Sequence, residues 1–146
     1  MGSTFVVNVA DVDAALLAKL GADATLMAYL PDGVWRDMAP APATRFCIVQ
    51  TVLHADVEAF KAPLFEVYHY RVTARALQTT GVDVNGAAFR IHALLQDADL
   101  GPIPGAVHMQ TLRVDRVGPY VEVDAFDRDV RWQVAGAEYE IHISPV

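Results

Sequence analysis

The side chains able to bind metal ions or catalyse reactions are scattered along this chain and form no motif. The five histidines are His54, His69, His92, His108 and His142. No two of them lie two or four residues apart, and the zinc-binding pattern H-E-x-x-H is absent. Those in predicted strands have acidic or polar neighbours, as exposed strand histidines do, and His92 lies off the apolar stripe of a predicted helix. We therefore predict no metal site.

The single cysteine, Cys47, cannot form a disulfide within the chain. It lies between Phe46 and Ile48 in an apolar stretch, so we predict a buried, inert thiol and not a nucleophile. The sequence contains no glycine-rich phosphate-binding loop and no G-x-S-x-G nucleophile motif. These absences favour a protein without enzymatic activity and without a cofactor.

One pair of carboxylates has a spacing that acid–base catalysis uses. Glu138 and Glu140 flank Tyr139 on one face of the last predicted strand. No recognisable pocket accompanies them, so a polar outer face or a contact with another subunit explains them better. The segment 82–86 begins like a calcium loop but lacks the remaining ligands, and we interpret it as a helix start capped by Asp83.

Apolar residues at helical spacing predict two short helices near the N-terminus. The first covers residues 12–20, with Asp11 as its N-cap and Gly21 at its C-terminal end. The second runs from about residue 23 to residue 30. The turn sequence Pro31-Asp32-Gly33 ends it.

The middle of the chain has the composition of strands. A short strand is possible at 34–36, and the β-branched run 46–53 predicts a strand near the centre of a sheet. The stretch 54–63 breaks this pattern, and we predict a loop of about ten residues there. Trp35 and Trp132 fit either the core or a subunit interface, and the core is favoured for both.

Clean alternation predicts a strand over 65–77, with Tyr68 and Tyr70 filling the core. The strongest helical pattern in the chain follows at 82–98. Its apolar stripe is expected to pack on the sheet face that carries Tyr70.

The last third of the chain predicts β-structure after a proline- and glycine-rich turn at 101–105. Strands are expected at 107–117, 120–125 and 129–143. Within the last of these, the apolar positions change from even to odd numbers near Ala135-Gly136. A β-bulge or a hairpin turn at that point would explain the change, and we favour the bulge.

These elements predict an α+β fold, a two-layer sandwich in one domain spanning residues 1–146. Its mainly antiparallel sheet would carry one long helix and two short N-terminal helices on one face. Apolar residues make up 53% of the chain, which excludes a disordered protein, and the start lacks a signal peptide, so we expect synthesis in the cytosol. The net charge of −7 and the lack of a basic stripe argue against a protein that grips nucleic acid.

The order of elements resembles the tail terminator, or tail completion, family of long-tailed bacteriophages over essentially the whole chain. Two helices precede the proline-containing segment 39–42 and the strand that starts with 46–49. The strand 70–76 then leads through a Thr-Gly turn into one long amphipathic helix, and strands close the chain. Family members often carry proline just before the first core strand, where this chain has Thr44-Arg45.

The resemblance implies a structural virion protein. Such a protein forms a ring, commonly a hexamer, that caps the tail tube, ends its polymerisation and joins the tail to the head. Its partners would be other copies of itself, the tail tube protein and the head–tail connector, and it would enter the virion after assembly in the host cytoplasm. Another neck protein is the nearest alternative, and a small cytosolic ligand-binding or enzymatic α+β domain is a more remote one.

Charged residues and one phenylalanine on the predicted loop and strands are candidates for contacts with a neighbouring subunit or the tail tube. They are Asp56, Glu58, Phe60, Lys61, Arg71, Arg75, Glu138 and Glu140. Ordinary solvated strand positions explain Arg71 and Arg75 equally well. If DNA passes through the ring, we expect a neutral or acidic channel that does not bind it specifically, because basic residues would hold phosphates and hinder transit.

Overall fold

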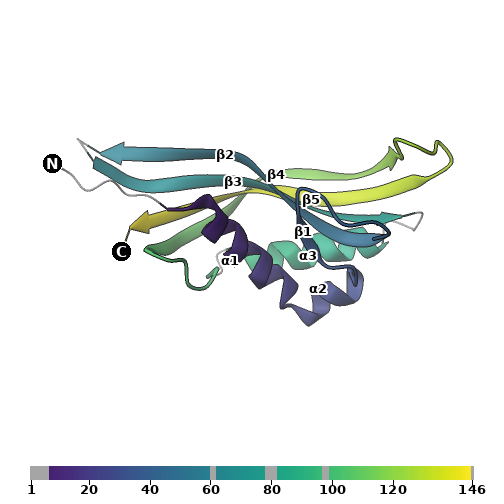
Figure 1. The fold of residues 1–146 in the computed structure, drawn as a ribbon, viewed down its shortest axis with the longest axis horizontal. Coiled ribbons are helices and arrows are strands. Elements are labelled where there is room, and N and C mark those ends of the chain that lie inside the picture. The colour runs from purple at the N-terminus through teal and green to yellow at the C-terminus, as the bar shows by residue number, and fades with distance from the viewer. Residues whose placement is uncertain (1–6, 60–61, 78–81, 97–98, 146) are drawn as a thin grey trace.

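The computed structural model describes residues 7–59, 62–77, 82–96 and 99–145, with residues 54–59, 62–64 and 145 described through their backbone only. A five-stranded sheet forms one layer, and three helices lie together on one of its faces (Figure 1). This arrangement confirms the predicted α+β two-layer fold. The elements in chain order are α1 (Val9–Gly21), α2 (Ala24–Tyr29), β1 (Val34–Arg36), β2 (Arg45–Ala59), β3 (Ala62–Leu77), α3 (Val82–Leu95), β4 (Ala106–Val123) and β5 (Arg131–Pro145).

The strand order in the sheet is β1-β2-β3-β5-β4. β1 pairs with β2 in parallel, and the other neighbours are antiparallel. The predicted loop at 54–63 is wrong, because β2 and β3 continue as a long hairpin in which Ala59 pairs with Ala62. Backbone hydrogen bonds hold such a hairpin together without strongly apolar side chains, so composition alone did not predict it.

The boundaries of α1 and α3 differ from the prediction at both ends of each helix. α1 begins at Val9, and Asn8 is its N-cap, with a side-chain oxygen that accepts a hydrogen bond from the Ala10 amide at 3.0 Å. Asp11 therefore lies in the first turn, and the C-cap is Ala22, one residue after Gly21. α3 begins at Val82, which places Asp83 inside its first turn, and it ends at Leu95. Asn and Asp are about equally good N-caps, so propensity could not choose between Asn8 and Asp11 at the start of α1.

The core lies between the helices and the sheet. The α3 stripe is buried, as predicted, and packs over β3 and β5, where Tyr68, Tyr70 and Tyr139 are the largest fully buried side chains. Its fully buried members are Val84, Ala87, Ile91 and Leu95, whereas Ala88 and Leu94, which belong to the predicted stripe, are partly buried. Cys47 is also fully buried, and burial raises the pKa of its thiol to about 12. An inert thiol follows, as expected.

The apolar phase change in β5 comes from neither a bulge nor a hairpin in that strand. β5 pairs with β3 without interruption from Trp132 to Ile143. The irregularity lies in the partner strand β4, whose register against β5 shifts between Val117 and Tyr120. The two predicted strands 107–117 and 120–125 are therefore one strand, with Gly118 at a φ of 72° in the shifted segment.

The apolar positions of β5 change from even to odd numbers because side chains pack against opposite faces of this strand along its length. Near its start, Trp132 lies on the face away from the helices, in an edge-to-face contact with Phe46 at a ring separation of 5.6 Å. Further along, Tyr139 is buried on the helix face. Trp132 is thus half-buried beside a small outer cluster, whereas Trp35 is 39% exposed and does not join the core.

Candidate functional site

The described residues contain no group of His, Cys, Asp or Glu side chains placed to hold a metal ion. None of the described helices is both long and apolar enough to cross a membrane. The features that stand out are surfaces: a cleft beside α3, a projecting hairpin end, and open edges of the sheet.

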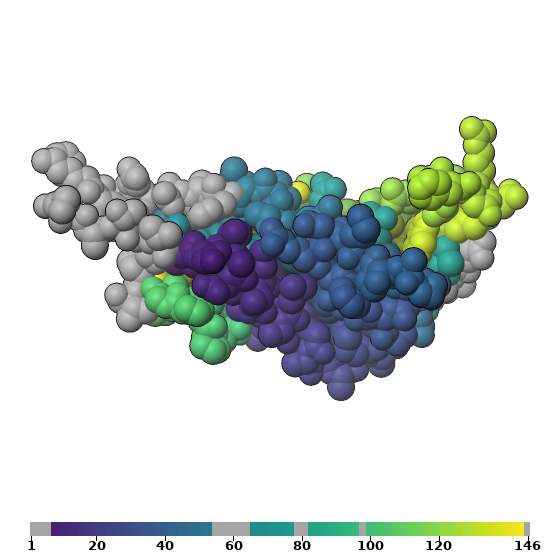
Figure 2. Space-filling view, in the orientation of Figure 1, coloured from purple at the N-terminus to yellow at the C-terminus, as the bar shows by residue number. Residues whose placement is uncertain are grey.

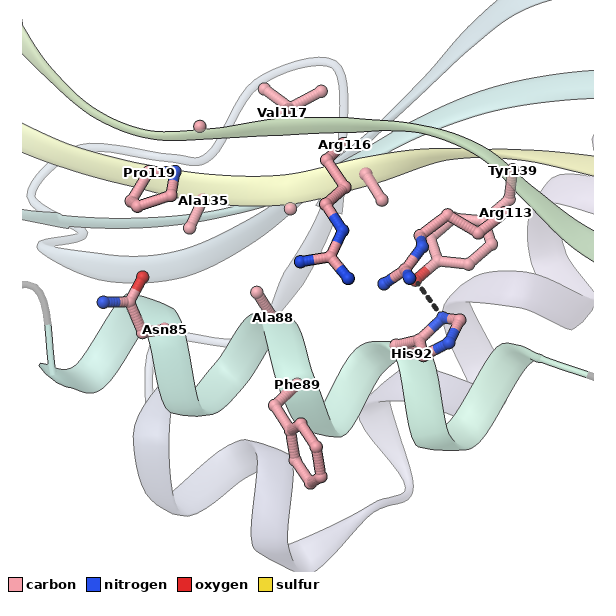
Figure 3. A pocket seen from close by; sticks show the side chains of 13 residues that line it. Asn85, Ala88, Phe89, His92, Arg113, Arg116, Val117, Pro119, Ala135 and Tyr139 are labelled. Carbon is pink, nitrogen blue, oxygen red and sulfur yellow. Dashed lines mark hydrogen bonds between the residues drawn. The ribbon is translucent and has the colours of Figure 1, made fainter.

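The cleft lies between α3 and the paired strands β4 and β5, with a volume of about 370 Å³ (Figure 3). Asn85, Ala88 and His92 line it from α3, and Arg113, Arg116 and Tyr139 line it from the sheet. Arg116 extends from β4 toward the helix, whereas Phe89 points away from the sheet and is 78% exposed. The cleft is therefore open to solvent and has an exposed aromatic ring nearby.

A register shift in β4 places both arginines in this cleft. Residues three apart in a regular strand face opposite sides of the sheet. Here the pairing shifts between Arg113 and Asp115, so that Arg113 lies opposite Tyr139 and Arg116 lies opposite Ala137. Tyr139 and Ala137 both belong to the helix-side core, so both arginines face the helices. The shift depends on the pairing with β5, and sequence periodicity gave no signal of it.

The cleft is cationic. Within the described part of the chain, neither the Arg113 nor the Arg116 guanidinium has a carboxylate partner. Tyr139 Oη lies 3.3 Å from His92 Nδ1, and their rings stack at 6.1 Å. Burial raises the pKa of Tyr139 to about 12, and the nearby charge of Arg113 opposes that rise. The site thus presents two arginines, a histidine and a neutral phenol, which suits an anionic group.

The connection between β4 and β5 is a turn at the far end of the sheet that side-chain hydrogen bonds hold in place. Asp124 organises it: its carboxylate accepts hydrogen bonds from the amides of Phe126 (3.0 Å) and Asp127 (3.1 Å) and from Trp132 Nε1 (3.0 Å). The hydrogen bond from Trp132 is the main reason that the pKa of Asp124 is lowered. The turn leaves Phe126 98% exposed. Figure 2 shows this yellow-green end of the molecule standing clear of the body.

The sheet has open edges on both sides. β4 is an edge strand, and no described strand pairs with its outer side. It carries several apolar side chains that are 42–54% exposed: Val107, Met109, Val114, Tyr120, Val121 and Val123. At the opposite edge, β1 covers β2 only from Cys47 to Val49. Long apolar edges of this kind are ready to pair with another chain.

Charged residues proposed from the sequence on β3 and β5 have partners within the chain. Arg71 and Glu138 are opposite each other on neighbouring strands, with Nη2 and Oε1 3.6 Å apart. Arg75 Nη1 lies 2.7 Å from Glu122 Oε2 on β4. Glu140 Oε1 lies 3.1 Å from His142 Nε2. These pairs form a polar ladder on the sheet face away from the helices.

The four remaining candidates belong to the end of the β2–β3 hairpin. Asp56 and Glu58 lie in the distal half of β2, and Phe60 and Lys61 lie outside the described residues. The structure therefore separates the predicted residues into two groups, one at the end of the β2–β3 hairpin and one in the polar ladder. Neither group includes the cleft arginines, which the sequence did not single out.

Comparison of the sequence with known protein families gives no match, and comparison with curated proteins gives none either. Comparison with solved structures does find similar folds. The fold is shared with a virion chain. That chain belongs to the virion of a native gene transfer agent (GTA) particle, with a TM-score of 0.63 and 16% sequence identity. The superposition covers 97% of this chain and 99% of the other.

Proposed function

We propose that this chain is a structural virion protein that forms a ring, a hexamer by its resemblance to tail terminators, at the head-proximal end of a phage-type tail. In that position it ends polymerisation of the tail tube and joins the tail to the head. The observation that carries the proposal is the match to a GTA virion chain over nearly the full length of both chains. The order of elements that resembles the tail terminator family supports the same role.

The open surfaces support assembly into a ring. A cyclic assembly needs two different complementary surfaces on each subunit. The exposed apolar edge of β4 and the part of β2 beyond β1 lie on opposite sides of the sheet, so each subunit has two distinct edges to offer. The tail tube protein and the head–tail connector are the proposed partners on the two faces of the ring.

The proposed channel lets DNA pass without specific binding. The chain carries a net charge of −7, and Arg75 is paired with Glu122 inside the subunit. Paired arginines are less available to phosphates than free ones, and an acidic ring repels DNA. Arg71 keeps a half-exposed side chain beside Glu138 and remains a candidate for a contact between subunits.

The oligomeric state is the first test. Light scattering and negative-stain electron microscopy of the purified protein should show a closed ring. Adding the ring to polymerising tail tube protein should then give tubes that stop growing at the capped end. A monomer at all accessible concentrations, or unchanged tube growth in the presence of a ring, contradicts the proposed role.

A second test separates a tail terminator from another neck protein. Particles produced without this chain should contain tails of uncontrolled length if it terminates the tube. Tails of normal length that fail to join heads would instead assign it to the connector side of the neck.

A further inference from the structure

We infer that the cleft between α3 and β4–β5 receives the acidic β4–β5 hairpin end of a second copy of this chain. The inference rests on the proposed ring and adds a second pair of complementary surfaces to the sheet edges described above. We define the hairpin end as residues 124–130, which connect the two strands.

The cleft needs an anionic partner. Arg113 is half-buried, and its guanidinium and that of Arg116 meet no carboxylate within the described part of the chain. Hydrogen bonds from a guanidinium to a carboxylate are among the strongest a protein surface can make. His92 and Asn85 add further polar groups on the helix side. The apolar part of the lining, such as Ala88 and Pro119, leaves room for a ring or methylene groups beside the charge.

The hairpin end matches these requirements. Phe126 is 98% exposed at its tip, and Asp127, Arg128 and Asp129 follow it, so that residues 124–130 contain three aspartates and one arginine. Asp124 holds the turn closed by accepting three hydrogen bonds, and Asp127 Oδ1 accepts one from the Asp129 amide at 3.0 Å. The end therefore presents an aromatic ring and acidic side chains on an ordered turn, which lowers the entropy lost on binding.

The partner must be another copy, because the hairpin cannot fold back into its own cleft. β4 and β5 remain paired up to Val123 and Arg131, at the base of the turn. The turn lies at the end of the molecule, whereas the cleft lies beneath the body of the sheet beside α3 (Figures 1 and 3). A contact between two different surfaces on identical chains repeats head to tail, and it closes into a ring when the rotation allows.

Reciprocal charge reversal tests the inference. Arg113→Glu with Arg116→Glu should convert the ring to monomers, and so should Asp127→Arg with Asp129→Arg. Mixing the two variants should restore association, because the reversed cleft then meets the reversed hairpin end. Circular dichroism and thermal unfolding establish that each variant is folded. Phe126→Ser should weaken the ring, whereas Met38→Ser, at a position 79% exposed in the loop after β1, should not.

A cross-link gives a readout that does not require the ring to fall apart. Oxidation of a mixture of Phe126→Cys and Asn85→Cys proteins should give a disulfide between the two chains, while Met38→Cys with Asn85→Cys should give none. Cys47 does not interfere, because it is fully buried. Rings that persist in both charge-reversed variants, with no cross-link, overturn the inference and leave the proposed ring in place. A monomeric wild-type protein, together with no cross-link between the two cysteine variants, overturns both.

Discussion

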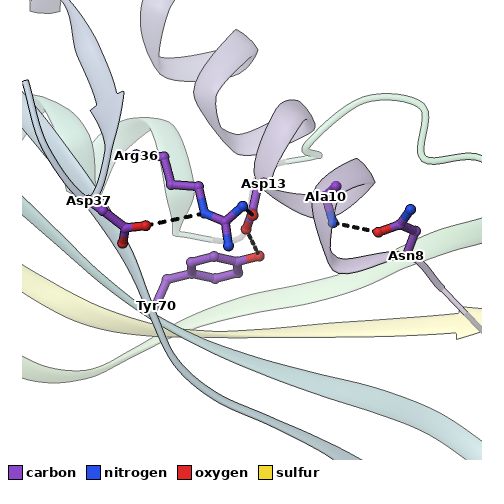
Figure 4. Close-up of polar contacts among 6 residues, drawn as sticks. All are labelled: Asn8, Ala10, Asp13, Arg36, Asp37 and Tyr70. Atoms are coloured by element: carbon purple, nitrogen blue, oxygen red, sulfur yellow. Dashed lines mark hydrogen bonds and ion pairs between the residues drawn. The ribbon is translucent and has the colours of Figure 1, made fainter.

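The hydroxyl of Tyr70 donates a hydrogen bond to Asp13 Oδ1 at 2.5 Å, joining the middle of β3 to the first helix (Figure 4). The other carboxylate oxygen, Oδ2, lies 2.9 Å from Arg36 Nη1 of β1 and makes an ion pair with it, although no aligned donor reaches that oxygen. Asp13 is only 3% exposed. One buried carboxylate therefore connects α1, β1 and β3, and Tyr70 supplies its shortest contact.

Removing this hydroxyl should destabilise the fold. Tyr70→Phe leaves a buried carboxylate without its hydrogen-bond donor, which typically costs about 1–3 kcal/mol of the free energy of unfolding. Urea unfolding followed by circular dichroism measures the change. Tyr120→Phe, at a 42% exposed position on β4, is the matched control and should be neutral. Equal stability of the two variants would show that the contact contributes nothing.

Asp23 should make the protein sensitive to acid. It caps α2 through the Leu26 amide (2.8 Å) and pairs with Arg90 of α3 at 2.6 and 2.8 Å. The hydrogen bonding from the Arg90 guanidinium is the main reason that the pKa of Asp23 lies below the ordinary 3.8. A lowered pKa contributes stability above the unfolded-state pKa, and that contribution disappears as the pH falls through the folded-state value.

The variant Asp23→Asn tests this expectation. It keeps a capping side chain but cannot ionise, so it should be less stable than wild type near neutral pH, with a smaller difference at a pH of about 3. Thermal unfolding across this range measures the difference. A gap that stays constant with pH would mean that the charge of Asp23 is not coupled to folding.

Gly136 should tolerate no side chain. A Cβ atom there would meet the carbonyl oxygen of Val72 and would lie 2.7 Å from the Thr73 Cα, both backbone atoms of the neighbouring strand. Gly136→Ala should therefore cost about 1–3 kcal/mol or more, as overpacking does. Gly21→Ala is the control, since a Cβ there meets nothing within 4 Å, and it should be neutral or slightly stabilising. Urea unfolding of the two variants measures the difference, and a Gly136→Ala midpoint equal to that of Gly21→Ala would contradict the prediction.

The end of the β2–β3 hairpin should serve assembly more than folding. Replacing residues 57–65 by an Asn-Gly turn keeps the paired residues Asp56 and Glu66 and removes Glu58, Phe60 and Lys61. The buried apolar residues of β3 begin at Tyr68, and the buried Glu66 is kept, so the melting temperature should change little. Ring formation or tube capping should be impaired. A shortened protein that assembles and caps tubes normally would show that this end has no such role.

Duplex DNA should not bind tightly to the assembled ring. The net charge of −7 per chain opposes association with phosphates. A gel-shift titration at low salt is the most permissive measurement, because screening is then weakest. Submicromolar binding that weakens as salt is added would contradict the proposed channel and indicate a DNA-binding role.

Local sequence patterns determined the fold class, the α3 stripe and the buried tyrosines of β3. Each depends on which face of a helix or strand is apolar, and periodicity reports this directly. The phase change near Ala135 was also visible, but its origin was not. Both sheet faces carry apolar clusters at different points along β5, and a one-dimensional pattern does not show which face is covered.

The surfaces that bear on function were decided by the tertiary structure. Arg113 and Arg116 share a face only because β4 shifts its register against β5. Asp13 contacts both Arg36 and Tyr70 only because the sheet places β1 and β3 on either side of β2. Strand pairing is a property of two backbones distant in sequence. The identity of the side chains along one strand constrains such pairing weakly, so the cleft and the extended hairpin emerge only when the strands are assembled.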